Sequence, residues 1–352
     1  MTGSRDLTRC GTMSAMRSTW LVALGLAACG TDPQGAYPPR TYSFGPITIP
    51  PNTEITDRCV QITLGNDQPL DINQVELATG PGFHHSNWFY VPESTFPGDD
   101  GVYHCADRNF DQAAAAFAGG VLFAQSTQSQ HDVQAFPAGA ALEVPAHHKL
   151  VSTIHLLNAT DTPIEIQPTM TITPIAPAAV TTKLRPMAFE DHALGLPPNA
   201  RSRFTLDCDL QQPWDLHRET NRSDHPDFHL YYALAHYHAY GTGMTIDAVA
   251  TDGTAATMFS TAAAIGDSLG GTLDPPFAMT GYTRLRFSCD YTNTTTTTIG
   301  WGNGVGEMCV FLAFTDSDYI WTGGAITDDP PGPATPDGGI MTYSHVCSPL
   351  AI

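Results

Sequence analysis

Residues 228–241 constrain the fold more than any other stretch, because they combine the composition of a β-strand with two evenly spaced histidines. The segment reads FHLYYALAHYHAYG, and large apolar and aromatic residues of this kind are typical of strands. In a strand, residues i and i+2 project from the same face. The imidazoles of His236 and His238 are therefore expected side by side, as two ligands of one metal ion require. We expect residues 244–250 to pair with this strand as a hairpin.

The overall composition favours an all-β protein. Charged residues make up only 14% of the chain, glycine, proline and threonine are abundant, and long amphipathic helical patterns are scarce. The 352 residues are enough for two domains. The proline- and alanine-rich stretch 174–182 is the best candidate for a boundary. We therefore predict an N-terminal domain over residues 46–182 and a C-terminal domain over residues 183–352.

The acidic balance of the chain argues against nucleic-acid binding. There are 15 lysines and arginines against 35 aspartates and glutamates, for a net charge of −20, and no basic stripe is visible. Such a charge suits an exported protein that must stay soluble outside the cytoplasm.

Residues 1–29 are predicted to be a secretory signal rather than part of the fold. Arg17 precedes a short apolar run over residues 20–28, which ends in small residues. A basic start, a short apolar centre and small residues before a cleavage point are typical of a signal peptide. The run is too short to span a bilayer as a permanent helix.

The signal ends in the sequence LAAC, which is similar to a bacterial lipobox. Cys29 is therefore the predicted lipidation site, and residues 30–45 are the predicted tether. This places the protein at the cell envelope, in the outer membrane and periplasm or at the cell surface, with the lipid as its membrane anchor. Ordinary secretion with Cys29 incidental is the alternative, and Met13 or Met16 can be the true start.

Export places the cysteines in an oxidising compartment, where disulfides form. Six cysteines lie beyond the signal: Cys59, Cys105, Cys208, Cys289, Cys309 and Cys347. If each domain pairs internally, Cys59 must join Cys105. The four cysteines of the second domain can pair in more than one way.

Three further histidines are candidate metal ligands. His84 and His85 are adjacent, after a glycine-rich turn, and His155 stands near the end of a predicted strand. Adjacent residues of a regular strand point to opposite faces. Both can bind one ion only if the backbone bends or bulges there, or if they use different ring nitrogens. A second adjacent pair, His147 and His148, competes for the same role.

Met308 narrows the choice of metal. It follows a glycine-rich turn in the sequence EMC. Imidazole suits copper, zinc, iron and nickel alike, whereas a thioether is a soft, neutral ligand that favours Cu(I) and is of little use to zinc. Two histidines and a methionine with an open position can hold reduced copper and bind O2. Taken alone, a methionine is more often a packing residue of the core.

Taken in order, these residues resemble the copper type II, ascorbate-dependent monooxygenases, the family of the peptidylglycine hydroxylating and dopamine β-hydroxylating enzymes. The resemblance runs from about Pro46 to Cys347. It implies two tandem antiparallel jelly-roll β-sandwiches that face each other across a solvent-filled cleft, with one copper ion on each side. The implied ligands are His84, His85 and His155 for the electron-transfer copper, and the catalytic set His236, His238 and Met308 for the oxygen-binding copper.

The resemblance also implies the disulfides and the reaction. The disulfides would be Cys59–Cys105, Cys289–Cys309 and Cys208–Cys347. The reaction would hydroxylate an unactivated C–H bond of a small molecule with O2 and two electrons. Ascorbate is the reductant in the animal enzymes, and in this chain ascorbate or another one-electron donor would take that place.

Three positions depart from the peptide-amidating members of the family. Those enzymes bind a substrate carboxylate with an arginine two residues before the His-x-His motif, and they use an asparagine and a tyrosine two and four residues after the methionine. Here these positions hold Leu234, Val310 and Leu312. A buried carboxylate would find no partner there. We therefore expect a neutral or apolar substrate, with a cationic amine, attracted by the acidic chain, as a weaker alternative.

Two other functions are compatible with the sequence. A copper-binding or copper-sequestering surface lipoprotein would bind copper without consuming O2. A structural sandwich module with incidental histidines would bind no stoichiometric metal.

Overall fold

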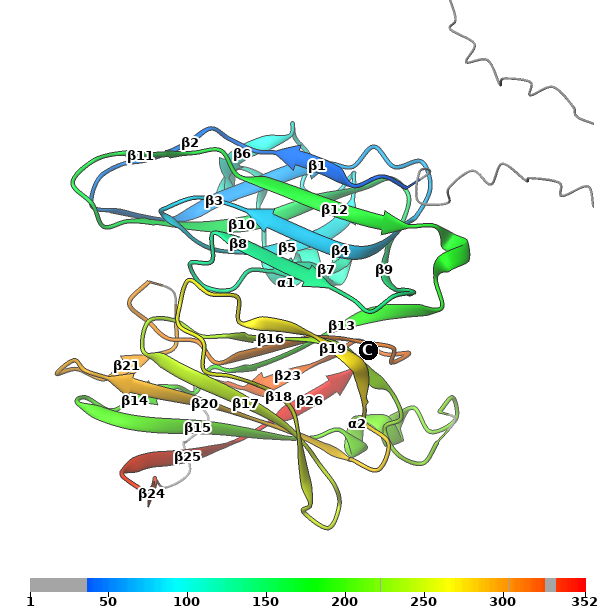
Figure 1. Cartoon of the computed structure of the whole chain (residues 1–352), viewed down its shortest axis with the longest axis vertical. Coiled ribbons are helices and arrows are strands. Elements are labelled where there is room, and N and C mark those ends of the chain that lie inside the picture. Colours follow the sequence, from blue (N-terminus) through cyan, green and yellow to red (C-terminus); the bar gives the residue numbers. More distant parts are fainter. Residues whose placement is uncertain (1–36, 222, 303, 327–333) are drawn as a thin grey trace, which may run out of the picture.

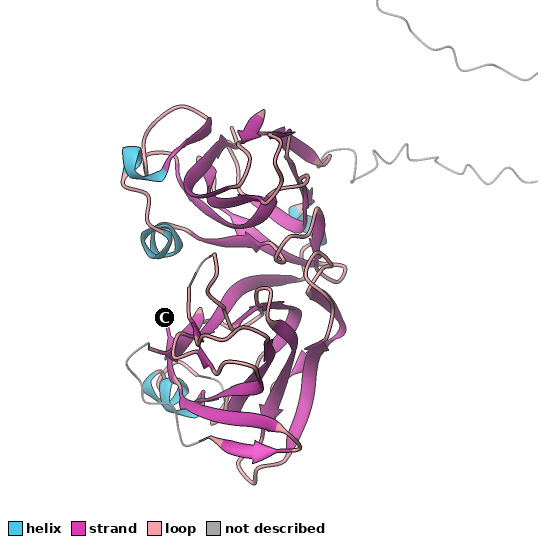
Figure 2. Ribbon diagram, turned by 90° about the vertical axis from the view of Figure 1, so that its left-hand side faces the viewer, coloured by secondary structure: helices cyan, strands magenta, loops and turns pink. Residues whose placement is uncertain are grey.

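The computed structural model describes residues 37–221, 223–302, 304–326 and 334–352, and most of these residues lie in β-strands. Figure 1 shows two β-rich bodies stacked along the long axis of the molecule, and Figure 2 shows that the few helices are short. The predicted all-β sandwich fold is confirmed. The predicted signal peptide and Cys29 lie outside the described residues.

The N-terminal sandwich consists of two main sheets. The first has the order β1 (Arg40–Ser43), β12 (Thr169–Ile175), β4 (Leu70–Ala78) and β9 (Ala140–Val144), and β8 (His131–Ala135) also pairs with β4. The second has the order β6 (Gly101–His104), β3 (Thr53–Thr63), β10 (His148–Asn158), β5 (Phe83–Pro92) and β7 (Gly120–Ala124). A separate small sheet pairs β2 (Ile47–Ile49) with β11 (Ile164–Ile166). The helical segments of this sandwich are η2 (Cys105–Arg108) and α1 (Gln112–Ala118).

The C-terminal sandwich also has two main sheets. The first has the order β13 (Thr182–Asp191), β22 (Val310–Thr315), β16 (His229–His236) and β19 (Gly270–Ala278), extended by β23 (Trp321–Ala325) and β26 (Ser348–Ala351). The facing sheet has the order β18 (Ala255–Thr261), β17 (Gly241–Val249), β20 (Arg284–Asn293), β15 (Ala200–Asp209), β25 (Ile340–Val346) and β24 (Thr335–Asp337). A short pair joins β14 (Gly195–Leu196) and β21 (Ile299–Gly300), and α2 (Gln211–Leu216) follows β15.

Strands β9 and β13 join the first sheets of the two sandwiches. After β12 the chain forms a short 3-10 helix, η3 (Pro177–Ala179), and enters β13 at Thr182. The first residues of β13 pair in parallel with β9, so that Thr182 lies opposite Ala140 and Leu184 opposite Leu142. The first sheets of the two sandwiches therefore form one continuous hydrogen-bonded sheet across the junction.

The alternation of side chains along the strands explains why the core forms between the sheets. On β15, Phe204 and Leu206 are buried between the sheets, and Phe287 on the neighbouring β20 is buried with them. The residues between them face outward, where Arg203 donates to both carboxylate oxygens of Asp290. A period of two therefore gives each strand one apolar and one polar face.

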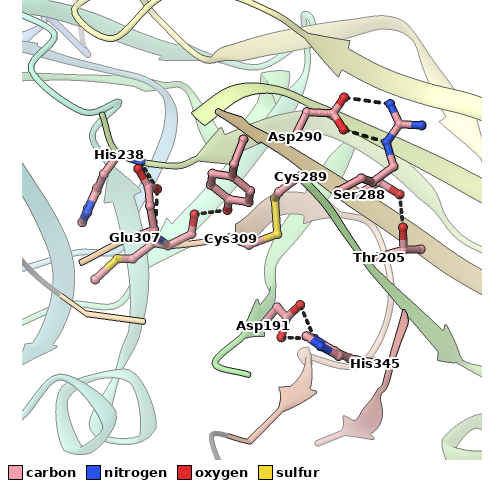
Figure 3. The surroundings of a disulfide bond; sticks show 12 residues. Asp191, Thr205, His238, Ser288, Cys289, Asp290, Glu307, Cys309 and His345 are labelled. Carbon is pink, nitrogen blue, oxygen red and sulfur yellow. Dashed lines mark hydrogen bonds and ion pairs between the residues drawn. A yellow bond between two sulfur atoms is a disulfide. The ribbon is translucent and has the colours of Figure 1, made fainter. Parts of the chain in front are cut away.

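All three disulfides implied by the family resemblance are present: Cys59–Cys105, Cys208–Cys347 and Cys289–Cys309. The last of these joins β20 in one sheet to the residue before β22 in the facing sheet (Figure 3). Disulfides of this kind indicate an exported protein in an oxidising compartment. Among the described residues, no helix has the length and apolar character needed to cross a membrane.

The folded part begins earlier in the chain than the sequence suggested. Residues 40–43, assigned above to the tether, form β1 and pair with β12. The reason is that this segment has packing partners of its own: Phe44 is 2% exposed, and Thr41 and Thr171 share a hydrogen bond of 2.9 Å between their hydroxyl groups. A tether can therefore extend only to the residues before β1.

Candidate metal centre

A β-bulge on β5 allows two adjacent histidines to face the same interior. His155 on β10 lies opposite His85, but the next residue, Leu156, lies opposite Phe83, so His84 is an extra residue in β5. A bulge of this kind re-aims side chains that a regular strand would alternate. His84 and His85 are both buried, at 5% and 7% exposure. The bend or bulge that His84 and His85 need in order to face one metal ion is therefore present.

The end of β16 places the second group of histidines. His236 is its last residue and lies opposite Val310 of β22. Two residues further along, His238 contacts residues 306 and 307 just before β22, and its N–H shares Oε2 of Glu307 with the N–H of Met308. The predicted hairpin with residues 244–250 is wrong. Both edges of β16 are occupied, by β22 and β19, and residues 244–249 of β17 pair with β18 and β20 in the facing sheet.

The buried carboxylate of Glu307 holds the backbone around His238, as Figure 3 shows. Its Oε2 accepts the N–H groups of His238 at 2.8 Å and of Met308 at 3.1 Å, and its Oε1 accepts the N–H of Tyr240 at 2.6 Å. Burial raises the pKa of Glu307 to about 7, against the backbone N–H groups, which lower it. The imidazole of His238 has its own partner, because Nδ1 lies 3.0 Å from the carbonyl oxygen of Gly306.

The structure brings all five predicted histidines into one cluster. The ring of His85 lies 5.0 Å from that of His155, 5.2 Å from those of His84 and His236, and 5.5 Å from that of His238, measured between centroids. None of the five is more than 7% exposed. The resemblance implied two sets on opposite sides of a cleft. Here the histidines of the two sets are in contact, and the sandwiches meet at this point.

Hydrogen bonds between the two sandwiches explain this contact. The hydroxyl of Thr127 donates to the carbonyl oxygen of Tyr237 at 2.8 Å, between the two histidines of the His-x-His motif. The hydroxyl of Ser126 accepts the N–H of Leu269 at 2.8 Å. Thr127, Ser126 and Leu269 are completely buried. The seam between the sandwiches is therefore closed beside the histidine cluster.

Burial keeps the imidazoles neutral. Desolvation, together with the neighbouring histidines, lowers the pKa of His84 and of His236 to about 3. It lowers the pKa of His85 well below its ordinary value. The pKa values of His155 and His238 are also lowered by burial, although their hydrogen bonds partly oppose the shift. Each neutral imidazole has one nitrogen with a free lone pair, which is the form that binds a metal.

Three of these histidines carry a buried ring nitrogen without a hydrogen-bond partner: Nε2 of His84, Nδ1 of His85 and Nε2 of His238. One nitrogen from each of these residues lies within 4.8 Å of the others. Buried polar atoms are normally paired, and imidazole is a ligand for copper and other transition metals. The residues therefore fit a bound metal ion.

Met308 is fixed in this neighbourhood through its backbone. Its carbonyl oxygen accepts the hydroxyl of Tyr291 at 2.6 Å, and the next residue, Cys309, is tied to Cys289. The side chain of Met308 is half-buried. The role of its thioether as a ligand stays a prediction.

The competing pair, His147 and His148, lies elsewhere. His148 begins β10 and His155 stands seven residues further along the same strand, which corresponds to about 23 Å. The Nδ1 of His148 lies 2.9 Å from the carbonyl oxygen of Ala146. This pair therefore does not belong to the cluster.

Two glutamates have positions in the centre that sequence reasoning did not assign. Glu307 was considered only as a neighbour of Met308, although a single acidic residue after four glycines was a usable signal. Glu54 accepts a hydrogen bond from Nε2 of His155 at 2.7 Å, from a position 101 residues away in the chain. No local pattern marks Glu54, because its partner is supplied by the pairing of β3 with β10.

Comparisons with known proteins identify no family. No protein-family model and no curated protein matches the chain. Among solved structures, the PBSX exported protein XepA is 9% identical with a TM-score of 0.19, over 78% of this chain and 86% of that protein. N-glycanase F is 8% identical with a TM-score of 0.26, over 79% and 88%. A β-porphyranase from Bacteroides plebeius is 11% identical with a TM-score of 0.19, over 74% and 35%. These TM-scores are too low to support an argument.

Proposed function

We propose that the protein is an exported, copper-dependent monooxygenase. It would hydroxylate a C–H bond of a small, neutral or apolar substrate with O2 and an external one-electron donor, ascorbate or another. The observation that supports this proposal is the buried cluster of five neutral histidines, three of which have an unpaired ring nitrogen. The backbone N–H groups of Met308 and His238 donate to the same oxygen of Glu307, which places the backbone of Met308 close to His238. Imidazole and thioether together favour copper over zinc.

The residues around the cluster would hold copper in a defined geometry. The candidate ligands are the members of the two predicted sets: His84, His85, His155, His236, His238 and Met308. Two copper ions per chain are expected from the family resemblance. Bound copper supplies the one-electron redox chemistry that O2 activation needs. The carbonyl of Gly306 and the carboxylate of Glu307 keep His238 in place, as partners of metal ligands do in other sites.

The expectation of a neutral or apolar substrate rests on apolar side chains near the cluster, which line a hollow of only about 10 Å³, too small for a substrate in this structure. Leu234 and Leu312 lie opposite each other on β16 and β22, and they line this hollow together with Val121 and Gln134 of the N-terminal sandwich. Leu234 stands two residues before His236 and therefore faces the same side of the sheet. None of the described residues that line the hollow is charged, so a substrate carboxylate that displaced these side chains would find no partner there.

The proposed location is the bacterial cell envelope. The three disulfides support export to an oxidising compartment. Attachment through a lipid on Cys29 is part of the proposal, and mass spectrometry of the N-terminal peptide from a bacterial host would detect it.

The first test compares the purified protein with the variant Met308→Ala. After copper loading, we expect two copper ions per chain, ascorbate-driven O2 consumption, and an electron paramagnetic resonance spectrum that Met308→Ala alters. The variant should lose at least about 90% of O2 consumption, because the thioether stabilises the reduced ion. Met341→Ala is the matched control, since Met341 is also half-buried but lies on β25. Undiminished O2 consumption by Met308→Ala would contradict the assignment.

A second candidate function is a copper-binding or copper-sequestering surface protein without turnover. The burial of the histidines favours it, since none is more than 7% exposed and a substrate must reach the metal. Stoichiometric copper without any reductant-driven O2 consumption would select this function over the first.

A further inference from the structure

We infer that the tight metal site is built across the seam, from His84 and His85 of the N-terminal sandwich and His238 of the C-terminal sandwich. In this arrangement His155 is a positioning residue for His85 and not a ligand. The family resemblance implies a different division, in which His155 completes the set of His84 and His85. The inference rests on the metal centre of the proposed function but not on its oxygen chemistry.

A chain of hydrogen bonds fixes which nitrogen of His85 is free. Nε2 of His155 lies 2.7 Å from Oε1 of Glu54, and a carboxylate only accepts, so Nε2 carries the proton of the neutral ring. Nδ1 of His155 is then an acceptor, and Nε2 of His85 donates to it at 3.1 Å. The remaining nitrogen of His85, Nδ1, keeps its lone pair. This is the atom of His85 that has no partner.

The same reasoning applies to His238. Its Nδ1 lies 3.0 Å from the carbonyl oxygen of Gly306, which can only accept a hydrogen bond. Nδ1 therefore carries the proton and Nε2 keeps the lone pair. Nε2 is again the atom without a partner.

His84 completes the set. Its Nδ1 lies 3.3 Å from Nε2 of the Gln128 side-chain amide, and the main chain of Gln128 is fixed nearby because its N–H donates to the carbonyl oxygen of His84. An amide nitrogen only donates, so in this orientation Nδ1 of His84 accepts. The two ends of a side-chain amide are nearly the same in shape, and metal binding at Nε2 requires the Gln128 amide to turn, so that its oxygen accepts from Nδ1 and Nε2 keeps the lone pair. Nε2 is the unpaired atom of His84.

The three residues are close enough to share one ion. One nitrogen from each lies within 4.8 Å of the others, and two nitrogens bound to one ion at about 2 Å are at most about 4 Å apart. His155 has no lone pair to offer without breaking its bond to His85. His236 and Met308 remain as donors for a second ion.

The test is a titration with copper(II) alone, with affinity measured by competition and coordinated imidazoles counted by pulsed electron paramagnetic resonance. We expect three imidazoles around the first ion in the unmodified protein. His238→Gln should leave two and weaken binding at least about 100-fold. His155→Gln should keep three and weaken binding about 10- to 100-fold, as changes to the partners of ligands do. His147→Gln, at an exposed position outside the cluster, is the control.

Glu54→Gln tests the hydrogen-bond chain at a partly exposed position, where folding is least affected. It should also keep three imidazoles while changing the spectrum in the same direction as His155→Gln. The opposite pattern, with three imidazoles in His238→Gln and two in His155→Gln, would overturn the inference and leave the monooxygenase proposal standing. The expected imidazole counts without any O2 consumption would support the inference and contradict the monooxygenase proposal.

Discussion

At the scale of single residues, the centre depends on groups that are not ligands. Glu54 orients His155, and through it His85, while Glu307 and Gly306 hold His238. These hydrogen-bond partners set the tautomer of each histidine and therefore which ring nitrogen has a free lone pair. A metal site depends on these partners as well as on the ligands themselves. The histidines could be selected from the sequence because their type and spacing are informative. Their partners could not, because glutamate and glycine are common residues whose role follows from the fold.

Glu307→Gln is expected to destabilise the protein by about 2–4 kcal/mol. Each oxygen of Glu307 accepts backbone N–H groups, and an amide replaces one of these oxygens with a donor. The variant therefore loses one or two hydrogen bonds to a charged group and leaves buried N–H groups unpaired. Chemical unfolding of the metal-free protein measures the difference.

Glu143→Gln is the matched control for this change. Glu143 forms an ion pair with Lys183 at the surface, and exposed ion pairs contribute about 0–1 kcal/mol. Equal stability of the two variants would show that Glu307 does not brace the backbone around His238.

At the scale of strands and sheets, local sequence patterns predicted the strand that carries His236 and the bend at His84, but they did not predict which strands pair with each other. The strand that carries His236 and the bend at His84 were both expected and both are present. The hairpin with residues 244–250 was expected and is absent, because β16 pairs with β22 and β19, which lie far along the chain. Alternation reports which face of a strand is buried, but it does not report which of several similar strands becomes the neighbour.

The disulfide Cys289–Cys309 connects the two sheets of the C-terminal sandwich next to Met308. It closes a loop of 20 residues, and a loop of that size corresponds to about 3 kcal/mol of stabilisation. Replacing both cysteines by serine should lower the free energy of unfolding by about this amount and broaden the copper spectrum, because Met308 loses the constraint on its neighbour.

The double serine variant at Cys59 and Cys105 provides the comparison. It removes a disulfide of the other sandwich. It should therefore reduce the free energy of unfolding without broadening the electron paramagnetic resonance signal of copper bound near Met308. Chemical unfolding and electron paramagnetic resonance measure the two effects separately. Identical spectra of the two variants would contradict a local role for Cys289–Cys309.

At the scale of the whole molecule, the docking of the two sandwiches determines the site. The sequence predicted two sandwiches and all five histidines, but it predicted them on two sides of a cleft. Their contact depends on Ser126, Thr127 and Leu269, which seal the seam. Serine, threonine and leucine are ordinary residues in a β-protein, and no motif marks them as interdomain contacts. Sequence patterns therefore could not predict that the two sets of histidines are in contact.

An ion bound by ligands from both sandwiches must stabilise their association. A ligand that binds only the folded protein contributes about 2.7 kcal/mol at a free concentration 100 times its dissociation constant. For a site that spans the seam, this stabilisation requires the sandwiches to remain docked. Calorimetry of the metal-free protein with added copper(II) should therefore show unfolding of both sandwiches shifting together to higher temperature. His238→Gln should remove most of the shift, while His147→Gln should retain it. A shift confined to one of two separate transitions would instead indicate a site within a single sandwich, and the histidines would then work as the two separate sets that the family resemblance implies.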